Sequence, residues 1–132
     1  MVSGMGTDKV LDNPGVNYCA FTLSPVFPTC PVTNEPFVVA VTVQYHPAGY
    51  IIEYVEFEKY LRRRVERTPA IHPEEFPEEC NRLTLEDLAV DALRRAGLLL
   101  GPDVPVCIIV ETIASYHCKA KAVAHTKNWE DV

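Results

Sequence analysis

The 132-residue sequence contains no C-x-x-C pair, no long apolar run and no excess of positive charge. Its five cysteines are scattered and odd in number, which argues against a disulfide framework and a zinc ribbon and fits a reducing cytoplasm. No apolar stretch reaches the ~18 residues that a membrane helix requires, and the N-terminus lacks a basic segment followed by a hydrophobic one. We therefore expect a cytoplasmic protein without a signal peptide and without a membrane partner.

The twelve basic residues are outnumbered by eighteen acidic ones, and the formal net charge is −6. The surface as a whole should therefore not attract nucleic acid. Two local clusters could still hold a polyanion on one face: the arginines of "RRRVER" at 62–67, and Lys119 with Lys121. Solvated faces of a helix and a strand explain them about as well. His46 and His117 have no second ligand at metal spacing, so we expect no metal site.

With 48% hydrophobic residues, a chain of this length can form one domain with its own core. Residues 1–16 are rich in Gly, Asp and Asn, so we expect a flexible tail there, followed by a single domain over residues 17–127. Hydrophobic periodicity predicts strands over 17–24, 37–45, 104–113 and 115–124, and helices over 52–67 and 84–96. This order predicts an α+β fold in which both helices cover one face of a four-stranded antiparallel sheet.

The two predicted helices have defined apolar faces and boundaries. The first carries on one side Tyr54, Phe57, Leu61 and Val65. In the second, Thr84 fits the N-cap and Asp87 the third helical position of a capping box, while Gly97 is expected to end the helix.

Two kinds of motif resemble a known family. The segment "CPVTNEP" resembles the C-P-x-T-G-Q-P signature of QueF, the nitrile reductase that acts on 7-cyano-7-deazaguanine. The segments "VQYHPAGYIIEYVEFEKYL" and "LEDLAVDALRRAG" are similar to the archaeal QueF-like amidinotransferases, which make archaeosine by adding ammonia to the nitrile of this base in tRNA. The resemblance covers about residues 20–124. It implies the tunnelling fold (ββααββ) and self-association into rings, for example a decamer of two pentamers, with active sites between neighbours.

The resemblance also implies roles for particular residues. Cys30 matches the nucleophile, whose thiolate attacks the nitrile carbon and forms a covalent thioimide. Glu86 matches the glutamate that binds the guanine-like edge of the base, since a carboxylate can accept two N–H donors. An alternative alignment on "FPEEC" would give this role to Glu78 instead. A small buried thiol at position 30 and an acid favoured by the helix dipole at position 86 are the structural alternatives.

The sequence departs from the family at several positions. Phe37 stands where the family has an aspartate that moves a proton, and Leu85 stands where it has a histidine. Val55 and Glu58 replace lysines of the reductase's NADPH motif, which argues against that cofactor. Glu35 is the nearest carboxylate to the cysteine; it could supply the missing proton transfer, or it is a solvated turn residue. Phe37 could begin its strand or stack on the base.

The expected function is that of a QueF-like amidinotransferase without a redox cofactor. Its partner would be 7-cyano-7-deazaguanine, either as the free base or within tRNA. Two alternatives stay open: an NADPH-dependent reductase of the queuosine pathway, and a non-catalytic member of the fold that binds deazapurines.

Overall fold

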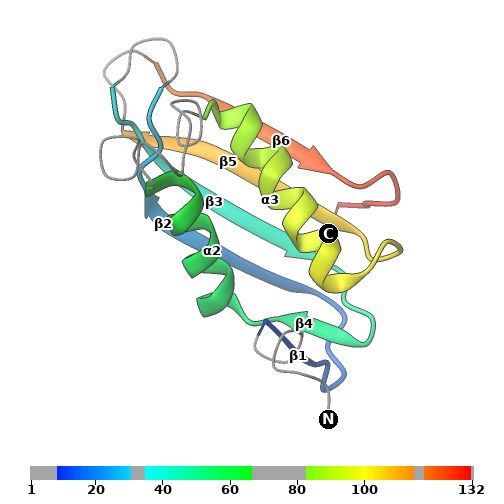
Figure 1. Cartoon of the computed structure of the whole chain (residues 1–132). Coiled ribbons are helices and arrows are strands. Elements are labelled where there is room, and N and C mark those ends of the chain that lie inside the picture. The colour runs from blue at the N-terminus through cyan, green and yellow to red at the C-terminus, as the bar shows by residue number, and fades with distance from the viewer. Residues whose placement is uncertain (1–8, 31–34, 67–82, 115–117, 132) are drawn as a thin grey trace.

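The computed structural model describes residues 9–30, 35–66, 83–114 and 118–131 (Figure 1). The chain contains, in order, β1 (Val10–Asp12), β2 (Cys19–Val26), β3 (Val38–Tyr45), β4 (Tyr50–Ile52), α2 (Tyr54–Glu66), α3 (Leu85–Leu100), β5 (Val106–Ala114) and β6 (Lys121–His125).

The main sheet has four antiparallel strands in the order β2-β3-β5-β6, and this confirms the predicted α+β fold. Both helices lie on the same face of this sheet, side by side (Figure 1). Helix α2 packs over β2, and α3 packs over β5 and β6. The fold is therefore two-layered, with the helices on one side of the sheet.

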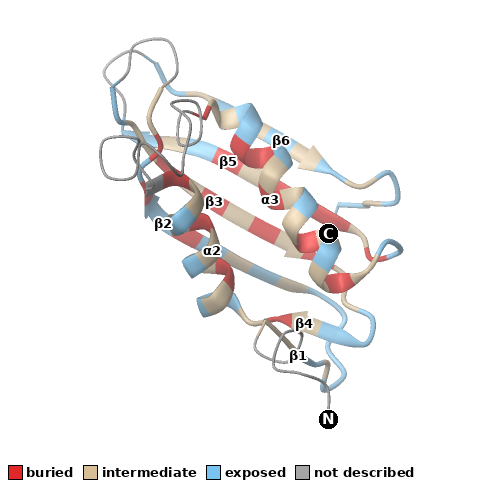
Figure 2. Cartoon of the chain, viewed as in Figure 1, coloured by how far each residue is buried: buried red, intermediate tan, exposed pale blue. Residues whose placement is uncertain are grey.

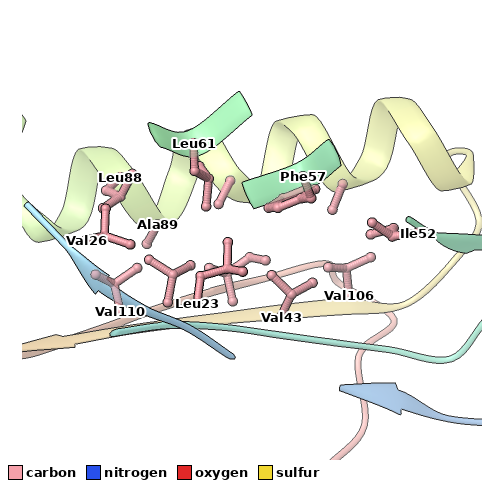
Figure 3. Packing of buried hydrophobic residues seen from close by; sticks show 14 of the residues in the cluster. Leu23, Val26, Val43, Ile52, Phe57, Leu61, Leu88, Ala89, Val106 and Val110 are labelled. Carbon is pink, nitrogen blue, oxygen red and sulfur yellow. The ribbon is translucent and has the colours of Figure 1, made fainter. Parts of the chain in front are cut away.

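Alternation along β3 separates the two faces of the sheet. Val41 and Val43 are fully buried toward the helices and pair with Val110 and Ile108 of β5, whereas Thr42 between them lies on the other face. Because β3 and β5 are the central strands, their helix-facing side chains lose nearly all contact with water. Figures 2 and 3 show the resulting core between the sheet and the helices.

Helix α2 buries Phe57, Leu61 and Val65, as its period predicted. The prediction for Tyr54 was wrong, because 60% of its surface is exposed. Tyr54 is the first residue of the helix and lies near the edge strand β2, where its ring centroid is 5.9 Å from that of Phe21. Most of the Tyr54 side chain therefore stays in contact with water.

Helix α3 begins as predicted and ends later. Thr84 is the N-cap and forms both hydrogen bonds of a capping box with Asp87. The expected stop at Gly97 was wrong. The helix continues to Leu100, which is buried, and Gly101 takes a φ of 103° while its N–H donates to the Gly97 carbonyl. Burial of one more apolar residue favours the extra turn, and a glycine suits the left-handed cap.

Part of the segment expected to be a tail is instead a strand. Residues Val10–Asp12 form β1, which pairs with β4 in a separate two-stranded sheet. Asn13 then fixes the chain, because its side-chain amide donates to the carbonyls of Val16 and Ala48. The pairing is long-range, so composition alone did not reveal it.

The C-terminal segment also extends past the expected domain end at residue 127. Trp129 stacks on His46 with ring centroids 4.8 Å apart, and Thr126 donates its N–H to the Val106 carbonyl. Strand β6 itself begins at Lys121 rather than at residue 115. Just before it, Ala120 donates its N–H to the Thr112 hydroxyl, so side-chain bonding replaces a regular ladder step there.

Tyr45 gives the fold a testable dependence on pH. Only 2% of its surface is exposed, its phenol oxygen accepts the Ile52 N–H at 2.8 Å, and burial raises the pKa of Tyr45 above its usual value. A folded state that keeps the phenol neutral loses stability as the pH rises above the unfolded pKa of about 10, by about 1.4 kcal/mol per pH unit for one such group. Burial and then Asp91 also raise the pKa of Tyr60, which adds to the alkaline slope.

We expect Tyr45→Phe to lower the free energy of unfolding by about 1 kcal/mol at pH 7, because the Ile52 N–H loses its acceptor. The same substitution should flatten the loss of stability between pH 9 and pH 11. Urea denaturation at both pH values measures this, with Tyr50→Phe as the exposed control. Equal alkaline slopes for the wild type and Tyr45→Phe would contradict the assignment.

Candidate active site

The loop between β2 and β3 is closed by backbone hydrogen bonds that hold Cys30 in place. Phe37 donates its N–H to the Pro28 carbonyl at 3.0 Å, and Cys30 donates its N–H to the Glu35 carbonyl at 2.9 Å. Thr29 and Pro36 form a bridge between these two bonds. Pro28 and Pro36 have no N–H to donate, so both hydrogen bonds of this pairing use the N–H groups of Cys30 and Phe37. The sheet pairing thus continues as far as Cys30.

Cys30 and Glu35 lie opposite each other at the neck of this loop. Directly opposed residues of an antiparallel pair project to the same face, with Cβ atoms about 4.5–5.5 Å apart. Cys30 is half-buried and Glu35 is exposed. The arrangement brings one thiol beside one solvent-exposed carboxylate.

The start of α3 is attached to the same loop. Leu83 donates its N–H to the Thr29 carbonyl at 3.1 Å, and the N-cap Thr84 follows directly. Glu86 is exposed in the first turn, and within the described part of the chain its carboxylate has no hydrogen-bond or ion-pair partner. The loop, the C-terminal end of α2 and the N-terminal end of α3 all lie at one end of the molecule (Figure 1). Cys30, Glu35 and Glu86 therefore share this end.

Two of the positions at which the sequence departs from the family serve the core. Phe37 is half-buried and packs against the hydrophobic core just before β3. Leu85, the first residue of α3, is also half-buried against the core. Neither side chain offers an acid or a base. Glu78, the alternative to Glu86, lies outside the described residues.

Phe27 is an aromatic residue near the loop that sequence reasoning missed. It follows the fully buried Val26 and precedes Pro28, and 46% of its surface is exposed. The signal in the sequence was the alternation of side chains along a strand. Because Val26 faces the core, the next side chain lies on the opposite face of the sheet. Cys30 is three residues further along the same extended segment, so its side chain projects to the face opposite to that of Phe27.

The positions of the family's NADPH lysines lie on α2. Val55 is 45% exposed, and the Glu58 carboxylate forms an ion pair with the Arg62 guanidinium at 2.9 Å. Arg62 also donates to the Pro25 carbonyl at 2.8 Å. These two positions therefore offer an apolar side chain and an acid in place of two cations. The neighbouring Arg62 already bonds to Glu58 and to the Pro25 carbonyl.

Across the residues that the structure describes, no three His, Cys, Asp or Glu side chains are grouped so as to hold a metal ion. None of the helices in the same part of the chain has the length and apolar character needed to cross a membrane.

These features define an α+β domain with a ββααββ core that presents a cysteine on the loop after the first strand of its main sheet. The solved structure of an archaeosine synthase QueF-like in its apo form has the same fold, with a TM-score of 0.65. The match covers 88% of this chain and 99% of that chain at 17% sequence identity. No protein-family model and no curated protein matches the sequence. The likeness confirms the fold expected from the motifs, the tunnelling fold of QueF-like proteins.

Proposed function

We propose that the protein is an amidinotransferase that converts the nitrile of 7-cyano-7-deazaguanine in tRNA into an amidine, with ammonia as the nitrogen donor. The observation that carries this proposal is the position of Cys30, opposite Glu35 and at the same end as Glu86. The shared fold with an archaeosine synthase supports it.

The chemistry requires one nucleophile and one group that moves a proton. Glu35 accepts the thiol proton of Cys30, and the sulfur attacks the nitrile carbon. One carbon–nitrogen π bond breaks as the carbon–sulfur bond forms, and the nitrogen takes the proton, which gives a neutral thioimide. Ammonia then adds to the same carbon, a proton moves to the leaving sulfur, and Cys30 departs to leave the amidine. No electrons enter or leave, and covalent capture divides one difficult addition into two easier steps.

Recognition of the base needs an acceptor for the N–H donors of its edge. Glu86 would accept two N–H donors from the guanine-like edge, and its carboxylate has no competing partner in the described structure. Phe37 packs against the core and Phe27 projects to the face opposite to that of Cys30, so neither ring is assigned a stacking role.

The reductase alternative requires cations for the phosphates of NADPH. Val55 provides none, and Glu58 is an acid that already pairs with Arg62. These residues do not fit a phosphate group, so we derive no hydride transfer for this protein.

Self-association into rings belongs to the same proposal. Strands β2 and β6 are the outer strands of the four-stranded sheet, and each pairs with one neighbour among the described strands. An unpaired strand edge can add a strand from another copy, which would extend the sheet from subunit to subunit. Light scattering would detect the ring, and a monomer at all concentrations would oppose it.

Covalent capture is the direct test of the function. After incubation with free 7-cyano-7-deazaguanine without ammonia, the intact protein should gain the full mass of the base, because the addition loses no atoms. Ammonia should then remove the added mass and release an amidine. Oxidation of NADPH by the base would favour the reductase instead, and binding without a mass gain would favour the non-catalytic alternative.

A further inference from the structure

A group of arginines lies where α2 and α3 meet on the helical layer. Arg64 pairs with Asp91 at 3.6 Å, and Tyr60 donates its hydroxyl hydrogen to the same carboxylate at 3.2 Å. The Arg95 guanidinium lies over the Tyr60 ring, 4.6 Å from its centroid. The adjacent Arg63 and Arg94 are exposed. We call Arg63, Arg64, Arg94 and Arg95 the arginine cluster.

Among the described residues, few acids balance the charge of this cluster. In the described chain, Arg64 is the one member with an ion-pair partner, and the Nε atom of Arg95 is buried without a hydrogen bond. Two acids of α2 are already used by other cations, since Glu56 pairs with Lys59 and Glu58 with Arg62. A protein of net charge −6 thus concentrates cations on one local surface.

We propose that the arginine cluster binds the phosphate backbone of the RNA that carries the target base. This inference rests on the proposed function and deepens it by assigning a docking surface. Arginine suits phosphate because its planar fork donates two parallel hydrogen bonds, and stacking on Tyr60 holds the Arg95 guanidinium in one orientation.

The position of the cluster relative to Cys30 fits this role. The N-cap of α3 adjoins the Cys30 loop through the Leu83–Thr29 hydrogen bond. Asp91, at the centre of the cluster, is seven residues beyond Thr84, which places it about 10 Å along the helix axis. Phosphates of nucleotides flanking a base held at Cys30 can reach that distance.

The second basic site of the sequence is less suited to RNA. Lys121 is directly opposite Glu111 in the register of β5 and β6, so an acid accompanies it. Lys119 is exposed, but it contributes a single charge. With four arginines and Asp91 at its centre, the arginine cluster carries the larger local positive charge.

Fluorescence anisotropy with an unmodified tRNA transcript, measured from 50 to 200 mM salt, tests the surface. We expect Arg63→Glu and Arg94→Glu each to weaken binding about tenfold at low salt, and each to reduce the slope of log K against log salt by about 1. Both side chains are exposed, so the fold should tolerate the change. Lys127→Glu is the matched control, because it reverses the same charge on an exposed residue that follows Thr126, which bonds to Val106 at the end of the sheet away from the Cys30 loop.

The inference is overturned if both arginine variants bind tRNA like the wild type, if Lys127→Glu is equally impaired, or if the wild type does not bind tRNA at 50 mM salt. Loss of binding only in Lys119→Glu and Lys121→Glu would move the docking surface to β6, and so also overturns it. Covalent capture of the free base separates this result from the proposed function. The arginine variants should form the adduct normally, whereas a wild type that binds tRNA through the cluster but forms no adduct would refute the amidinotransferase alone.

Discussion

Cys30→Ala should abolish covalent capture of 7-cyano-7-deazaguanine and leave reversible binding of the base intact. The reason is that the loop is held by backbone hydrogen bonds from Cys30 and Phe37, which alanine at position 30 preserves. The substitution removes the sulfur and keeps the backbone donor of residue 30. Intact mass spectrometry should show no added mass, and isothermal titration calorimetry should show base binding within a few-fold of the non-covalent step of the wild type.

Cys118→Ala is the matched control for this prediction. Cys118 is an exposed thiol in the described chain, so it would react first if the adduct formed by unselective addition to accessible cysteines. We expect Cys118→Ala to form the adduct at the wild-type rate. An adduct that persists in Cys30→Ala, or one that disappears in Cys118→Ala, would remove Cys30 from the mechanism.

The proposed proton transfer by Glu35 differs from the pattern of the QueF family, and the geometry of the loop gives a reason for the difference. The position at which the family has an aspartate holds Phe37, whose side chain packs against the core at the start of β3. Two residues earlier, Glu35 lies opposite Cys30 in the backbone ladder. Because residues two apart in an extended segment project to the same face, an acid can move by two positions and keep its orientation toward a partner strand.

The main layers could be predicted from the sequence because they depend on local patterns. Alternation around Val41 identified a central strand, and Thr84 with Asp87 identified the start of α3. The pairing of β1 with β4 and the stacking of Trp129 on His46 join segments far apart in the chain. No local pattern encodes such contacts.

The candidate site was predictable to a similar extent. A motif was enough to single out Cys30, but the partner of a loop residue depends on where the ladder ends. A sequence with prolines at 28, 31 and 36 does not show that the Cys30 N–H reaches the Glu35 carbonyl. The exposure of Phe27 depends in turn on the inward direction of Val26, which becomes certain only when the register with Val39 is known.

The second large effect is expected at Glu86. If its carboxylate accepts two N–H donors of the base, Glu86→Gln should weaken reversible binding of 7-cyano-7-deazaguanine by about 10- to 100-fold, since hydrogen bonds to a charged group contribute about 1.5–3 kcal/mol. Binding should be measured in the Cys30→Ala background, where no adduct forms and the dissociation constant reports recognition alone. The free energy of unfolding should fall by less than about 1 kcal/mol, because Glu86 is exposed and loses only its interaction with the helix dipole.

Two further variants decide whether the edge contacts are the cause. Glu86→Ala removes both acceptor oxygens and should bind the base no better than Glu86→Gln. Asp103→Asn removes the same charge from an exposed acid beyond the C-terminal end of α3, at the other end of that helix, and should leave base binding unchanged. Full affinity in both Glu86→Gln and Glu86→Ala would exclude Glu86 from recognition of the base, and the role would then pass to the alternative acid, Glu78.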